Sequence, residues 1–86
     1  MKTYLVSYDL DKPGQNYEKL ISELERLGAF RVLFSQWAVQ LNNTAIEVRD
    51  HLLQFIDSND RMLVMEVGNW ASWGLMSSDK FKQIAA

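Results

Sequence analysis

Strand-type and helix-type runs alternate along this 86-residue chain, in the order strand, helix, strand, strand, helix, strand. The first strand-type run, Thr3 to Asp9, is rich in Tyr, Leu and Val and stops before a turn signal at Pro13-Gly14. A helix is predicted next, because apolar residues follow the spacing that lines one helix face. They are Tyr17, Leu20, Ile21, Leu24 and Leu27. Gly28 then suits the left-handed position that ends a helix.

The charged residues of this first predicted helix fall on the side opposite its apolar stripe. They are Glu18, Lys19, Glu23, Glu25 and Arg26. A charged helix face is usually solvated. We therefore expect all five side chains to lie on the surface.

The second half of the chain repeats the strand and helix pattern. Residues 29–41 are β-branched and aromatic, which favours two strands joined near Ser35-Gln36. The segment Thr44-Ala45-Ile46-Glu47 fits a capping box, in which threonine and glutamate bond to each other's backbone amides, so a second helix begins there. Residues 57–60 favour a turn. The nearly all-apolar run Met62 to Val67 predicts a central strand covered on both faces.

Two βαβ-type halves in series predict an α+β fold of the ferredoxin-like βαββαβ plait, with an antiparallel sheet and both helices on one face. We expect residues 1–67 to form this domain and residues 68–86 to form a C-terminal extension that packs on its own sheet or on that of a partner. Trp70 and Trp73 lie in this extension, and Ser77 to Ile84 predicts a short helix or a frayed end. Aromatic groups outside a core often cover a partner surface.

Composition limits the classes of function. A domain of this length buries only about 60% of the surface of its unfolded chain, which favours dimerisation. The chain has no cysteine, which excludes disulfides and thiol catalysis and favours the cytoplasm. The apolar run before Asp9 is too short for a signal peptide or a membrane span. The net charge of −2 counts against non-specific nucleic-acid binding, although a basic patch assembled across a dimer stays open.

Asp9 is the first candidate for chemistry, because a carboxylate at the end of an inner strand is held rigidly beside a cleft. Asp11 lies two residues further along. Mg²⁺ needs only one or two carboxylates, and a two-fold axis near the first strand would pair Asp9 with its own copy. Asp9 and Asp11 could instead only shape the turn before Pro13-Gly14. Their spacing alone favours this turn role over a metal site.

Other candidates have plainer alternatives. His51 is the only histidine and lies between charged residues of the second predicted helix, where a histidine is more often inert than catalytic. Arg31 and Arg61 each open a strand, where a guanidinium can bind a phosphate, although a salt bridge is commoner. Ser35 falls in a predicted turn, and no Ser-His-Asp arrangement is evident.

Three segments taken together resemble a known family. They are Tyr4 to Asp9, Leu27 to Trp37 and Phe55 to Val64. The small second Cas protein of CRISPR adaptation and its relative, virulence-associated protein D, show a strand ending in Tyr-Asp, a Gly-x-x-Arg-Val-x-x-Ser segment, and an Ile-Asp-x-x-Asp turn before a hydrophobic strand. The likeness covers residues 3–67. Three further segments look closer to a SinR-like bacterial and phage branch: Lys12 to Gln15, Arg49 to His51, and the segment around Trp70.

The resemblance implies a ferredoxin-like homodimer in which Asp9 lies at the dimer cleft and binds Mg²⁺ for hydrolysis of RNA or DNA. It also implies that Arg31 and Ser35 lie near that cleft as catalytic residues. The resemblance also implies a second possibility, a scaffold that binds nucleic acid without hydrolysing it. The segment Gln15 to Lys19 counts against this scaffold, since the CRISPR proteins carry several basic residues there. The residues themselves leave open a non-catalytic dimeric interaction module that binds a partner protein through its aromatic tail.

Overall fold

Four strands and three α-helices follow one another in residues 1–11 and 17–85, the parts of the chain that this computed structural model describes. They are β1 (Lys2–Asp9), α1 (Glu18–Arg26), β2 (Phe30–Leu33), β3 (Gln36–Leu41), α2 (Ala45–Leu52), the 3-10 turn η1 (Leu53–Phe55), β4 (Arg61–Glu66) and α3 (Ser78–Ile84). The predicted order of elements is confirmed, while the predicted Pro13-Gly14 turn lies outside the described residues. No helix in these ranges is long and apolar enough to cross a membrane.

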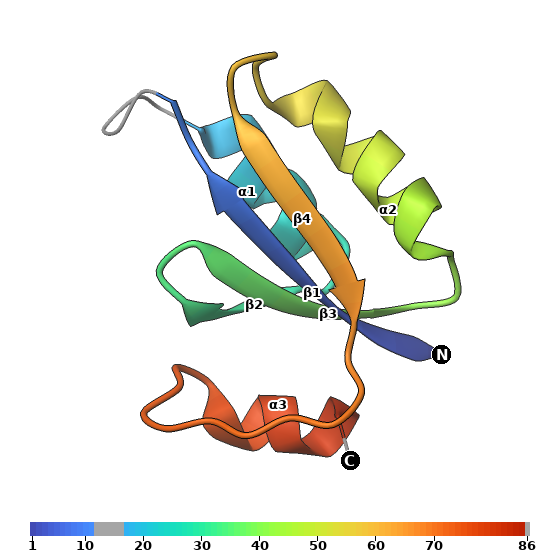
Figure 1. Ribbon diagram of the computed structural model, residues 1–86, viewed down its shortest axis with the longest axis vertical. Helices are drawn as coiled ribbons and strands as arrows, with labels where there is room; N and C mark the ends of the chain where they lie inside the picture. The colour runs from blue at the N-terminus through green and yellow to red at the C-terminus, as the bar shows by residue number, and fades with distance from the viewer. Residues whose placement is uncertain (12–16, 86) are drawn as a thin grey trace.

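The strands form one antiparallel sheet in the order β2-β3-β1-β4 (Figure 1). β1 is an inner strand, since Val6 lies opposite Trp37 of β3 on one side and opposite Val64 of β4 on the other. The protein is therefore a small α+β fold whose first strand is paired along both edges.

The prediction of a central, doubly covered strand at Met62 to Val67 is wrong. β4 is an edge strand, and its Leu63 and Met65 are 56% and 46% exposed. A continuous apolar run usually indicates cover on both faces. Here only the helix-covered face of β4 packs against the core, through Met62 and Val64.

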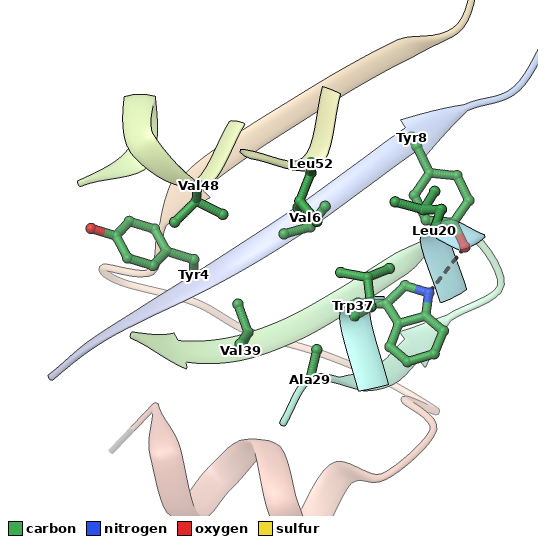
Figure 2. Packing of buried hydrophobic residues seen from close by; sticks show 10 residues of the cluster. Tyr4, Val6, Tyr8, Leu20, Ala29, Trp37, Val39, Val48 and Leu52 are labelled. Carbon is green, nitrogen blue, oxygen red and sulfur yellow. Dashed lines mark hydrogen bonds between the residues drawn. The ribbon is translucent and has the colours of Figure 1, made fainter. Parts of the chain in front are cut away.

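Helices α1 and α2 cover one face of the sheet. Side chains alternate along β1, so every second residue points to this face. The cluster of buried residues is formed by Tyr4, Val6, Tyr8, Leu20, Leu24, Ala29, Trp37, Val39, Val48 and Leu52. Figure 2 shows the Trp37 indole N–H donating to the Tyr8 hydroxyl at 3.0 Å, which satisfies the polar ends of two buried aromatic side chains.

Local signals set the helix ends as predicted. Gly28 has a φ of +83°, and its amide and the next one bond back to the last turn of α1 in a Schellman motif. The capping box of α2 is present, since Thr44 Oγ1 accepts from the Glu47 amide and Glu47 accepts from the Thr44 amide. These contacts determine where each helix meets the sheet.

The segment after β4 turns back over the opposite face of the sheet, where Figure 1 shows α3 apart from the other two helices. The Met76 amide donates to the Val32 carbonyl at 3.0 Å, and Thr3 Oγ1 donates to the Ile84 carbonyl at 2.5 Å. The buried Phe81 of α3 packs in one cluster with Val32 and Ala38. The C-terminal segment thus forms a second apolar core on its own sheet.

Candidate functional site

Asp9 ends β1 as an exposed carboxylate. Its position at the end of an inner strand agrees with the prediction. Tyr8 points into the helix-covered core, so alternation directs Asp9 to the opposite face of the sheet together with Ser7. No ion pair involves Asp9 within residues 1–11 and 17–85.

A shallow groove of about 270 Å³ runs along this end of β1 and β4. It is lined by Ser7, Tyr8, Asp9, Arg61, Met62 and Leu63. Arg61 is the direct register partner of Asp9 across the two strands. The groove therefore presents a carboxylate and a guanidinium side by side, a combination that can contact a metal ion and a phosphate.

Arg31 lies on the other face of the sheet. Its register partner is Trp37, and its guanidinium carbon lies 4.9 Å from the Trp37 ring centroid and 5.8 Å from that of Phe34. Its Nε is buried without a hydrogen-bond partner among the described residues, so stacking on the two rings is what holds the cation. The sheet therefore separates Arg31 from Asp9.

Ser35 and Gln36 lie beside the Asp9 end of β1. The Tyr8 amide donates to the Ser35 carbonyl at 3.1 Å, and Gln36 Nε2 donates to Ser7 Oγ at 2.6 Å. Ser35 thus approaches Asp9 through its backbone. Gln36 was not among the predicted site residues, and only the pairing of β3 with β1 brings it there.

Asp60 positions the chain that follows Asp9. One carboxylate oxygen accepts from the Asp11 amide at 2.8 Å and from the Tyr17 hydroxyl at 3.2 Å, and the other accepts from the Asp57 amide at 2.8 Å. The predicted turn at residues 57–60 is confirmed by a hydrogen bond from the Asp60 amide to the Asp57 carbonyl. Asp60 therefore ties the loop after β1 to the loop before β4.

The residues at the groove suit Mg²⁺ only in part. Among the described residues, no three His, Cys, Asp or Glu side chains lie close enough together to hold a metal ion. Mg²⁺ binds through one or two carboxylates and keeps several waters, so an exposed Asp9 is a suitable ligand. Asp9 is the one carboxylate among the described residues that line this groove.

A second polar cluster links the two helices that cover the sheet. Glu23 of α1 accepts from Nε and Nη2 of Arg26 at 2.7 and 2.5 Å, and His51 Nε2 of α2 lies 2.5 Å from the same carboxylate. The prediction that Glu23 lies on a solvated surface is wrong, since it is only 8% exposed. The side chains of Arg26 and His51 cover it.

These contacts determine the charge of Glu23. The hydrogen bond from Arg26 is the largest cause, followed by that from His51, and together they lower the pKa of Glu23 to about 2. The same pairing raises the pKa of Arg26. Glu23 is therefore ionised near neutral pH and can only accept hydrogen bonds. Sequence reasoning missed this cluster, although the i, i+3 spacing of Glu23 and Arg26 was a signal.

An apolar cavity of about 240 Å³ lies between the second face of the sheet and the C-terminal segment. Trp70 packs edge-on against Phe81 with ring centroids 4.6 Å apart, and its Nε1 donates to the Ala85 carbonyl at 3.1 Å. Trp73 also lines the cavity but is 97% exposed. The two tryptophans that were grouped by sequence therefore have different environments.

A comparison with models of known protein families finds no match for this sequence. Two carboxylates stand out among residues 1–11 and 17–85: Asp9, which is exposed at the groove, and Glu23, which is buried between the helices.

Proposed function

We propose that the chain acts as a ferredoxin-like homodimer, similar to the small second Cas protein and virulence-associated protein D, that hydrolyses phosphodiester bonds of RNA or DNA with Mg²⁺. The observation that carries the proposal is Asp9, an exposed carboxylate at the end of an inner strand and beside Arg61. The strand order β2-β3-β1-β4, with α1 and α2 on one face, supports the ferredoxin-like plait. The absence of cysteine supports a cytoplasmic location.

Each residue at or near the groove has a distinct proposed role. Asp9 and its copy in the second protomer would hold Mg²⁺, which supplies Lewis-acid polarisation of the phosphate when bound. Arg61 would bind a phosphate oxygen through its guanidinium. Ser35 keeps the end of β1 in place through its carbonyl. Arg31 would have a structural role, because its guanidinium stacks on Trp37 on the sheet face opposite to Asp9.

Replacing Asp9 with alanine is expected to lower Mg²⁺-dependent cleavage of RNA or DNA by about 100-fold or more, because loss of a residue that only supports a metal ligand already costs roughly 10–100-fold. Cleavage of labelled single- and double-stranded substrates with Mg²⁺ or Mn²⁺ measures it. Asp79→Ala, at an exposed carboxylate on α3, is the matched control and should cleave like wild type. Equal background activity in wild type and Asp9→Ala would rule out the enzyme.

The dimer surface is proposed to be the exposed side of β4. Leu63 and Met65 lie opposite Ser7 and Leu5 of β1, so they share a sheet face with Asp9. β4 pairs on one side only among the described strands, and an uncovered edge is a template for pairing with another chain. Association through this surface would bury two apolar side chains and bring Asp9 towards its copy.

The double substitution Leu63→Lys and Met65→Lys is expected to weaken the dimer by about 30-fold or more, because two apolar contacts become desolvated charges. Sedimentation velocity over a concentration series measures the dissociation constant. Leu53→Lys, at an exposed leucine of η1, should leave it unchanged. A wild type that stays monomeric at every concentration would contradict the dimer.

The exposed indole of Trp73 favours a second candidate function, a non-catalytic dimeric module that binds a partner protein. Tryptophan is enriched among the residues that anchor interfaces, and the cavity beside Trp73 offers an apolar recess for a partner side chain. The cleavage assay separates the two candidates. If the protein is a non-catalytic module, neither wild type nor any variant should cleave above background with any divalent metal.

A further inference from the structure

A cavity of about 240 Å³ lies at the end of α1 and the start of α2, and its lining residues are not those of the Asp9 groove. Three of its lining residues are aliphatic and four are polar or charged. They are Leu27, Leu41, Val48, Arg26, Asn43, Glu47 and His51. Such a mixture suits a ligand with a short apolar body and one polar end.

The ionised Glu23 determines which atom of His51 carries the proton. A carboxylate can only accept, so the 2.5 Å contact assigns a hydrogen to Nε2 of His51. In the neutral ring, the other nitrogen, Nδ1, then has a free lone pair. His51 also lines the cavity, so in its neutral form it brings a hydrogen-bond acceptor to that site.

Glu47 brings a second acceptor and a negative charge. It lies four residues before His51 on α2, a spacing that places both on one helix face. Its Oε1 accepts from the Thr44 amide at 2.8 Å, which leaves Oε2 for a ligand. No salt bridge involves Glu47 within the described residues.

The charges at the cavity favour a cation. Arg26 stays charged, and its charge is balanced by the ionised Glu23, which accepts its two hydrogen bonds, so Glu47 adds a negative charge that this ion pair does not compensate. A phosphate or carboxylate ligand would meet this negative charge. An ammonium group has three donors and no acceptor, which matches the acceptor groups that the lining residues Glu47, neutral His51 and Asn43 carry.

We propose that this cavity binds a small primary aliphatic amine, with its ammonium group on Glu47 and His51 and its methylene chain against Leu27, Leu41 and Val48. The aliphatic stem of an amine gains from apolar cover while its charged end stays hydrogen-bonded. The site lies on the helix side of the sheet and is independent of the proposed cleavage at Asp9.

Titration of the ¹⁵N-labelled protein with n-butylamine, followed by NMR, tests the proposal. The expected result is saturable shift changes at Asn43, Glu47, Val48 and His51. n-Butanol has the same chain without the charge and tetramethylammonium has the charge without donors, so neither should bind there. Equal binding of either compound, or shifts at other residues only, would overturn the proposal.

Glu47→Gln is the decisive variant. Glutamine also serves at this position of a capping box, so α2 should keep its first turn. We expect butylamine affinity to fall by about tenfold or more, the usual effect of losing a hydrogen bond to a charged group. Asp50→Asn is the control on the same helix, because its carboxylate is bonded to Arg49. An equal fall in both variants would mean diffuse attraction only and would overturn the site.

Discussion

Replacing Phe81 with alanine is expected to lower the free energy of unfolding by about 3–5 kcal/mol, the usual range for a buried phenylalanine. Phe81 is 3% exposed and packs against Val32, Ala38 and the ring of Trp70. Alanine would leave a cavity under α3 and uncover the second face of the sheet. Urea unfolding followed by circular dichroism measures the change.

The control for Phe81 is Trp73, the exposed aromatic side chain of the same segment. Trp73→Ala is expected to change stability by no more than about 0.5 kcal/mol, because exposed side chains contribute little. Equal and small effects of both substitutions would show that the C-terminal segment is not part of the core.

Removing the chain after Val67 is expected to unfold or strongly destabilise the protein rather than merely to remove a binding tail. The truncation strips the cover from Val32 and Ala38 and takes away the hydrogen bond between Thr3 and Ile84. Domains of this kind have only about 5–15 kcal/mol of stability to lose. Partner binding by the tail is therefore better tested with Trp73→Ala, which leaves the second core in place.

Replacing Glu23 with glutamine is expected to remove part of the loss of stability that acid causes in the wild type. The pKa of Glu23 in the folded state, about 2, lies below its ordinary value of 4.5. A depressed pKa means that the charged form stabilises the fold above the ordinary value, and that this contribution disappears as the pH falls towards the folded value. Wild type should therefore lose stability between roughly pH 5 and pH 2.

Glu23→Gln should be less stable than wild type at neutral pH, since Arg26 and His51 lose a charged partner. Its stability should also change less than that of the wild type over the acid range. Denaturant unfolding at a series of pH values measures both effects. Glu25→Gln is the matched control, an exposed glutamate on the same helix. If Glu23→Gln kept the wild-type acid profile, the contacts with Arg26 and His51 would not control the stability.

Local features of the fold could be predicted because each depends on residues close together in the chain. The Gly28 helix end and the capping box at Thr44 and Glu47 need only a few neighbouring residues. The position of Asp9 at the end of an inner strand followed from the order of the elements.

Features that depend on strand pairing could not be predicted in the same way. The run around Leu63 is apolar enough for a central strand, yet β4 pairs on one side only among the described strands. Arg31 and Asp9 were assigned to one site, but register and alternation place them on opposite faces of the sheet. The exposure of Glu23 was predicted from the charged face of its own helix, while its burial depends on His51 from another helix.

The sequence by itself determined the order of strands and helices, their ends, and the carboxylate that closes β1, because backbone propensity, capping and alternation act between near neighbours. Only the tertiary structure decided which face each polar side chain occupies and which helix it meets. Those outcomes come from contacts between segments distant in the chain, such as the pairing of Asp9 with Arg61 and the contact of Glu23 with His51. Short-range sequence patterns carry no record of such contacts.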